Sequence, residues 1–182
     1  VTEHIELGSS VVPTYPRHPM VMAQQALTTS VITGGRFTLG LGLSHKFIVE
    51  DWQGLEWATP IHHLREYLTV LNGLLDGEQV VHEGKEYQVS LNMAPFTQLN
   101  VPDAPRPQVV IAALGPGMLK VTGELADGTN CWMCGQGYLE STLVPTINKA
   151  AENTIKELSP NAYKHYNDVN NAYKANGTYI NN

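Results

Sequence analysis

The sequence has little of what several classes of protein require. Its 182 residues include only two cysteines, too few for the disulfide framework of a small secreted domain. Basic residues number 11 against 17 acidic ones, and the net charge of −6 argues against a nucleic-acid or anionic-membrane partner. No apolar run approaches the roughly 20 residues of a spanning helix. A cytoplasmic protein that binds neither nucleic acid nor membrane is therefore expected.

What is present is a globular composition, with 42% hydrophobic and 15% charged residues. The length suits one main domain, which we place at residues 1–158. Residues 159–182 are rich in Asn, Tyr and Lys and almost lack aliphatic side chains, which predicts a poorly packed or disordered tail. The chain opens at Val1 on strand-like sequence, so we expect a fragment or truncated member of a longer protein.

Strand-like and helix-like segments alternate along the main domain. The strand-like segments are apolar on both faces, as in a parallel sheet covered by crossover helices, and lie at residues 4–12, 37–43, 109–114 and 129–134. Helices are predicted at residues 20–33, 61–75, 116–126 and 138–158, the last interrupted or started afresh at Pro145, with a β-hairpin at 80–89. The fold class is therefore α/β, with about four parallel strands where a closed (β/α)8 barrel needs eight.

The stretch GGRFTLGLGLSH (34–45) invites comparison with a dinucleotide-binding loop. That loop needs a third glycine where this chain has His45, and a helix starting there after the strand. Neither condition holds. We interpret Gly34-Gly35 as a helix stop and residues 37–43 as a buried strand whose glycines permit close packing against a helix or a flat ligand.

The stretch ALGPGM (113–118) joins a strand to a helix. Gly115 and Gly117 leave the backbone bare, and Pro116 presets the helix start. The free N–H groups of such a first turn could bind an anion. The alternative is an ordinary strand–helix turn with no ligand.

The stretch CWMC (131–134) has the spacing of a redox or zinc motif. If these residues form a strand, side chains three apart face opposite sides, so Cys131 and Cys134 could share neither a metal nor a disulfide. Structural cysteines and no metal site are the favoured interpretation, and a redox or metal protein is the alternative.

Histidines supply the remaining candidates for acid–base chemistry. His62 and His63 lack a carboxylate in ligand spacing and are predicted to be surface or core-edge residues. Tyr15, Arg17 and His18 follow the carboxyl end of a strand, where parallel barrels carry their active face, but the turn could equally be structural.

Several segments together resemble the luciferase-like monooxygenase superfamily, and within it the oxidoreductases that use the deazaflavin coenzyme F420. They are GSSVVPTYPRHP (8–19), GGRFTLGLGLSH (34–45), TPIHHLREYL (59–68), VVIAALGPGMLKVTGELADGT (109–129) and LVPTI (143–147). The resemblance implies a TIM barrel, here partial, with the cofactor at the carboxyl ends of the strands. It also implies an oxidoreductase that performs hydride transfer or monooxygenation on a small organic substrate, with F420 or alternatively FMN.

The resemblance also implies roles for particular residues. Family members often carry a bulge with a non-prolyl cis peptide in the third strand, here Ser10–Val11, which supports the cofactor ring together with Ser9. Gly42, Ser44 and His45 would line the pocket at the end of the fourth strand. Leu114, Gly115, Pro116, Gly117 and Met118 would form the phosphate turn, although the family usually has Arg or Lys where this chain has Gly117. His45 and His18 are the candidate catalytic residues.

A second hypothesis belongs to a different class. The chain could be a catalytically inactive half-barrel that binds cofactor weakly, or that pairs with another copy as a homodimer, because a four-strand half has two open edges.

Overall fold

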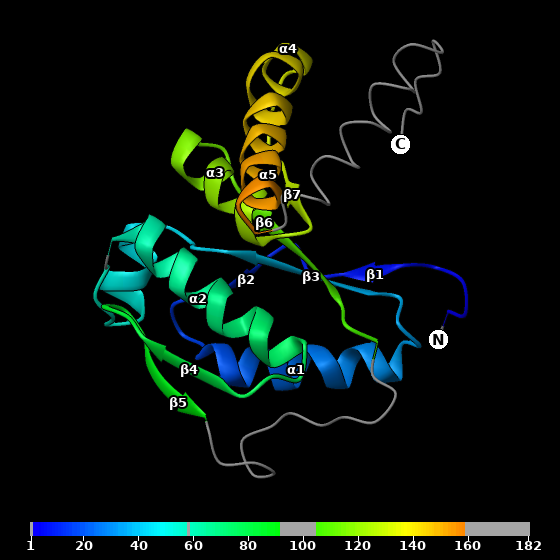
Figure 1. Ribbon diagram of the computed structural model, residues 1–182, viewed down its shortest axis with the longest axis vertical. Coiled ribbons are helices and arrows are strands. Elements are labelled where there is room, and N and C mark those ends of the chain that lie inside the picture. The colour runs from blue at the N-terminus through cyan, green and yellow to red at the C-terminus, as the bar shows by residue number, and fades with distance from the viewer. Residues whose placement is uncertain (1, 58, 92–104, 159–182) are drawn as a thin grey trace.

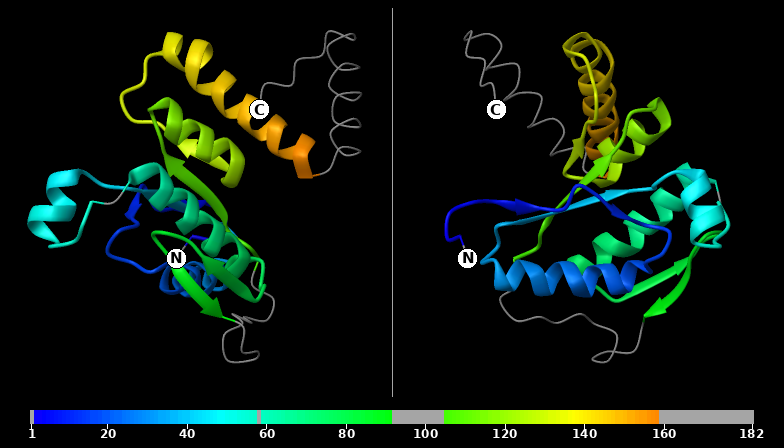
Figure 2. Two further views of the ribbon diagram at one scale, coloured as in Figure 1. Left: turned by 60° about the vertical axis from the view of Figure 1, so that its left-hand side comes forward. Right: turned by 180° about the vertical axis from the view of Figure 1, so that it is seen from behind.

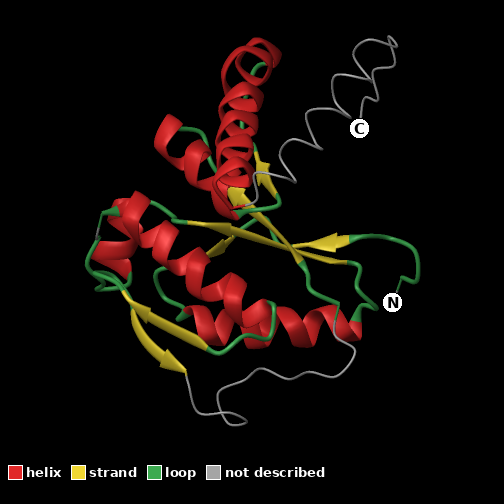
Figure 3. Cartoon of the chain, in the orientation of Figure 1, coloured by secondary structure: helices red, strands yellow, loops and turns green. Residues whose placement is uncertain are grey.

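The computed structural model describes residues 2–57, 59–91 and 105–158 and has an α/β architecture (Figure 1). Its main sheet is parallel, in the order β1(Leu7–Gly8), β3(Phe37–Gly42), β6(Gln108–Ala112) and β7(Gly128–Asn130), with β2(Val12–Pro13) also paired to β3. The predicted α/β fold with parallel strands is confirmed. Figure 3 distinguishes the helices from the strands of the sheet and of the hairpin.

The first predicted strand is broken in two by a bulge. Gly8 pairs with Thr38 and Val12 pairs with Leu41, so four residue steps on one strand face three on the other. The extra residue is the mark of a β-bulge. The Ser9 hydroxyl bridges the gap, donating to the Gly40 carbonyl at 3.0 Å and accepting from the Gly40 N–H at 2.9 Å.

The helices follow the strands in order around the sheet. α1(Pro19–Ile32) packs on α2(Pro60–Leu75), α2 on α3(Pro116–Leu125), and α3 on α5(Val144–Leu158). This succession is what right-handed crossovers between neighbouring parallel strands produce. The apolar face of α2 fills much of the core, with Leu64, Tyr67, Leu68, Leu71 and Leu74 fully buried. Thr59 stands at the N-cap of α2 but its hydroxyl donates to Glu86 Oε1 instead of capping the helix.

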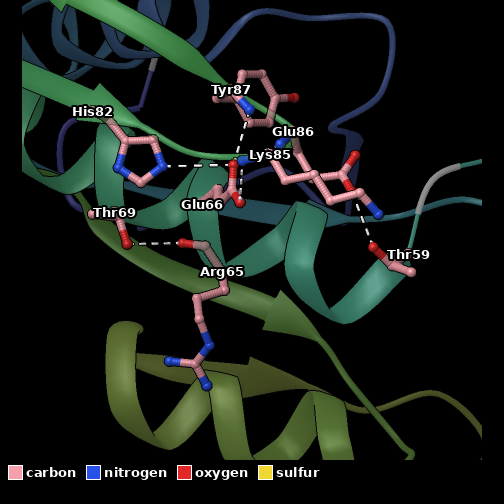
Figure 4. Close-up of polar contacts among 8 residues, drawn as sticks. All are labelled: Thr59, Arg65, Glu66, Thr69, His82, Lys85, Glu86 and Tyr87. Carbon is pink, nitrogen blue, oxygen red and sulfur yellow. Dashed lines mark hydrogen bonds and ion pairs between the residues drawn. The ribbon is translucent and has the colours of Figure 1, made fainter.

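The predicted hairpin is present as the antiparallel pair β4(Val80–Glu83) and β5(Gln88–Leu91). Both views of Figure 2 place it outside the parallel sheet. Its turn is held to α2 by Glu66, whose carboxylate accepts the backbone N–H groups of Lys85, Glu86 and Tyr87 at 2.8–3.0 Å (Figure 4). Burial acts to raise the pKa of Glu66, but these hydrogen bonds outweigh it and hold the pKa below its ordinary value.

The prediction of a strand over residues 129–134 is wrong at its carboxyl end. β7 stops at Asn130, and residues 131–135 form a loop in which Met133 has a left-handed φ of 54°. β7 pairs with β6 and stands at one end of the sheet order among the described residues, so no second neighbour extends it.

The last helical region begins at α4(Gln136–Tyr138) and widens into a π-helical turn, η2(Leu139–Leu143), before α5. Pro145, which lacks an N–H, follows this wide turn, so the predicted interruption falls where expected. Within the described ranges no helix has both the length and the apolar character that crossing a membrane requires. The predicted tail at 159–182 lies outside the described residues.

Candidate functional site

A cleft of about 640 Å³ opens where the parallel strands end. It lies beyond Gly42 of β3, Ala112 of β6 and the loop after β7, the edge at which parallel α/β proteins bind ligands. Its walls are mostly apolar: Val11, Leu43, Trp57, Pro60, Ile61, Ala112, Leu114, Met118 and Trp132. Such a volume and lining suit an organic cofactor.

One wall of the cleft comes from the bulge. The peptide bond between Ser10 and Val11 is cis, at the bond that the family resemblance implied. Val11 lines the cleft and packs against β3, where a Cβ on Gly42 would lie 2.7 Å from Val11 Cγ2. Position 40 likewise has no room for a side chain, because a Cβ on Gly40 would lie 1.9 Å from the Ser9 carbonyl oxygen. These two glycines therefore make room for the bulge and for Val11.

Another wall is the turn between β6 and α3. Gly115 is the N-cap of α3 and Pro116 the first helical residue, as predicted. The Leu119 N–H makes the first helical hydrogen bond, to the Gly115 carbonyl at 2.9 Å, so the N–H groups of Gly117 and Met118 have no acceptor within the helix. A Cβ on Gly117 would lie 2.4 Å from Ile61 Cδ1, so Ile61 fills the place of a longer side chain.

The structure brings most of the predicted site residues together. Val11, Gly42, Ser44 and His45 line the cleft with the turn 114–118. Ser44 has a left-handed φ of 70°, which turns the chain out of β3, and the exposed His45 ring stacks on Phe47 at 5.9 Å.

Three predicted residues do not line the cleft. Ser9 is occupied with Gly40 inside the sheet, and Ser10 precedes the cis bond with an exposed side chain. His18 caps α1, accepting the Met20 N–H on Nδ1 at 3.2 Å, and its ring meets the edge of Tyr87 at 5.9 Å. The geometry gives His18 a helix-capping position away from the cleft walls.

Sequence reasoning missed the aromatic walls of the cleft. Trp57 stands just before α2, and Trp132 lies in the loop after β7, both near carboxyl ends of strands. That position was the available signal, because loops following parallel strands meet at one edge of the sheet. Trp132 was instead assigned to a strand interior.

Behind Trp57 lies a stack of rings that includes a buried histidine. The Tyr15 ring stacks on Trp57 at 5.0 Å and on His63 at 3.9 Å with an interplanar angle of 3°. His63 is 5% exposed, and its Nε2 lies 3.0 Å from Thr14 Oγ1. Burial lowers the pKa of His63 to about 4 and raises that of Tyr15 to about 12, so both rings are neutral near pH 7. His63 is thus a core residue, while His62 is exposed as predicted.

The comparison with known proteins agrees with this geometry. The profile of the luciferase-like monooxygenase family matches residues 1–163. The chain is 35% identical over 133 residues to the F420-dependent glucose-6-phosphate dehydrogenase of Microbacterium testaceum, covering 70% of this chain and 37% of that protein. It is 33% identical over 165 residues to the enzyme of the same name from Beutenbergia cavernae, covering 87% of this chain and 47% of that protein.

A solved structure shares the fold. The coenzyme F420 dependent tetrahydromethanopterin reductase from Methanopyrus kandleri superposes with a TM-score of 0.69 at 26% identity, covering 85% of this chain and 47% of that one. The chain therefore spans about half the length, or less, of these relatives.

Proposed function

The chain belongs to the luciferase-like monooxygenase family, and from that premise we propose that it forms the cofactor-binding half of an F420-dependent oxidoreductase. The reaction would transfer a hydride between the coenzyme and a small organic substrate. The observation that carries the proposal is the convergence of three elements on one cleft: Val11 at the cis peptide, the end of β3, and the bare turn before α3. The two glucose-6-phosphate dehydrogenases and the reductase described above are F420-dependent by name, which favours F420 over FMN.

The residues of the cleft fit a flat ring that carries a phosphate-bearing tail. Val11, Leu43 and Trp57 offer apolar surface to a ring, and the N–H groups of Gly117 and Met118 offer two donors to a phosphate at the positive end of a helix. No Lys or Arg side chain lines this cleft among the described residues, so the phosphate would be held by backbone groups and the helix dipole.

When bound, the deazaflavin supplies the carbon that accepts or gives the hydride. The chain's own residues would position it and keep water away: Val11 would press on the ring from behind, and Trp57 would close the side of the cleft. His45 is the titratable side chain of the lining and would hold or deliver the proton that accompanies hydride transfer, through a ring nitrogen.

Fluorescence titration of the purified chain with F420, and with FMN in parallel, tests this proposal. We expect saturable binding of F420 with a dissociation constant at or below roughly tens of micromolar, and weaker binding of FMN. Absence of saturation by either compound would contradict it.

The inactive half-barrel is the rival, favoured by the share of the relatives that this chain spans. Within the described residues, β1 and β7 end the sheet order and leave edges on which a second copy could pair. This rival predicts F420 binding that is weak or absent, or a dimer by light scattering. A monomer that binds F420 with a dissociation constant at or below roughly tens of micromolar would exclude it.

A further inference from the structure

The loop that follows β7 brings together the only two cysteines of the chain. The left-handed turn at Met133 reverses the backbone, and Cys134 folds back so that its Sγ lies 3.8 Å from the Trp132 carbonyl oxygen. The Cys134 side chain is close enough to act on the Cys131 thiol, whose pKa it helps to raise, and both thiols are free. Because residues 131–134 form a loop and not a strand, the two thiols are not held on opposite faces of a sheet.

Access to the two thiols differs. Cys131 is exposed, whereas Cys134 is partly covered and packs against the hydrophobic core. One reachable thiol with a second beside it is the arrangement of an attacking and a resolving cysteine. Among the described residues no group of three or more His, Cys, Asp or Glu side chains could hold a metal ion, so no ligand set competes for these thiols.

We propose that Cys131 and Cys134 are a redox modification site, which exchanges with small disulfides to form a reversible intrachain disulfide at the rim of the cleft. The Cys131 thiolate attacks one sulfur of oxidised glutathione, forms a mixed disulfide and releases one glutathione thiolate. The Cys134 thiolate then attacks Cys131 Sγ and releases the second glutathione. Two protein thiols are oxidised, and one small disulfide is reduced to two thiols.

The site is coupled to the cleft through Trp132, the residue between the two cysteines. Trp132 lines the cleft, yet 78% of its surface is exposed. Its ring is therefore not fixed by packing in the core. Closing a ring across residues 131–134 changes the backbone on both sides of Trp132. Oxidation therefore alters one wall of the cleft.

Mass spectrometry of the whole chain after incubation with oxidised glutathione tests the chemistry. Because burial, reinforced by Cys134, raises the pKa of the Cys131 thiol, the incubation is best run at about pH 8.5, where more thiolate is present. We expect a product lighter by two hydrogens, with no free thiol left to alkylate and full reversal by dithiothreitol. Stable glutathione adducts, a chain-to-chain disulfide or unreacted thiols would each overturn the proposal.

Single variants distinguish the roles of the two cysteines. Cys134→Ser is expected to accumulate the glutathione adduct on Cys131, and Cys131→Ser to react at least about tenfold more slowly, because the remaining thiol is partly covered. Equal rates for the two variants would contradict the assignment of attacking and resolving thiols. If either variant fails to fold, the rates of alkylation at Cys131 and Cys134 in the unaltered chain, resolved by peptide mapping, make the same comparison.

Tryptophan emission tests the coupling to the cleft. Oxidation is expected to shift the emission of the unaltered chain, and Trp132→Phe is expected to abolish that shift, whereas Trp52→Phe, at an exposed site outside the cleft lining, keeps it. A disulfide that forms without moving the emission of Trp132 would refute the coupling. None of these readouts uses a cofactor, so their failure is distinct from a failure of F420 binding.

Discussion

His63 should make the stability of the protein fall on mild acidification. The ring is 5% exposed, stacked on Tyr15 and linked to Thr14, and burial is the main cause that lowers its pKa from 6.5 to about 4. The carboxylates of Glu86 and Glu66 act in the opposite direction and only partly offset the burial. The folded protein therefore resists a proton that the unfolded chain accepts readily.

The sign and size of the effect follow from that difference in pKa. Stability from the neutral ring is fully present above pH 6.5 and is lost as the pH falls toward 4, because the unfolded state then binds more protons than the folded state. At pH 5 the unfolded chain is nearly fully protonated at this site. The free energy of unfolding is therefore about 2 kcal/mol lower than at pH 7.5, and the loss rises to about 3 kcal/mol below pH 4.

Urea unfolding, followed by tryptophan fluorescence between roughly pH 4 and 7.5, measures this dependence. His63→Asn should lower stability at pH 7.5, because the ring stack is lost. Between pH 7.5 and 5 its free energy of unfolding should fall by about 2 kcal/mol less than that of the unaltered chain. His62→Asn, at the exposed neighbouring position, is the matched control and should keep the profile of the unaltered chain. Equal slopes for both variants, or a His63 ring that titrates near 6.5 by NMR, would refute the reasoning.

Two further predictions concern the parts that frame the site. Gly40→Ala should destabilise the protein by about 3 kcal/mol or more in urea unfolding, because its Cβ would overlap the backbone at Ser9, whereas Gly128→Ala, with its nearest contact at 3.4 Å, should cost about 1 kcal/mol or less. Similar costs for the two would show that the bulge is not tightly packed. Glu66→Gln should cost about 1–3 kcal/mol above pH 5, speed amide exchange in the hairpin turn, and lose its effect as the pH falls below the lowered pKa of Glu66. The exposed Glu83→Gln is its control, and unchanged exchange in the Glu66 variant would contradict the anchoring role.

The order of parallel strands and helices could be predicted because its determinants are local. The segment 37–43 is apolar on both faces, and Pro116 marks a helix start that the structure places at the same residue. The end of β7 could not be predicted in this way. The residues from Cys131 to Cys134 are apolar enough for a strand, but the backbone turns at Met133 and only β6 pairs with β7.

The candidate site could likewise be predicted only in part. The turn 114–118 and the end of β3 could be predicted as parts of the site, because glycines, prolines and strand positions are recognisable in the sequence. The need for glycine at positions 40 and 42 could not be predicted. The atoms that leave no room for a side chain there belong to Ser9 and Val11, about 30 residues away along the chain. His63 had a usable signal: it lies four residues before the buried Tyr67, on the face of α2 that packs inward.

The phosphate turn offers the most direct test of the central claim that this cleft binds F420. Gly115 has φ −73° and ψ 149° with open space around its Cβ position, and Gly135, the N-cap of α4, has φ −74° and ψ 150° and equally open space. Aspartate fits both positions without strain and favours both helices as an N-cap.

The measurement is the dissociation constant for F420 of Gly115→Asp and of Gly135→Asp, each against the unaltered chain. In Gly115→Asp the carboxylate takes up the N–H groups of Gly117 and Met118 and repels a phosphate, so we expect binding at least about tenfold weaker with stability kept or raised. Gly135→Asp adds the same charge and cap at a residue outside the cleft lining and should bind F420 as the unaltered chain does. If Gly115→Asp binds F420 as tightly as Gly135→Asp, the account of this site is wrong.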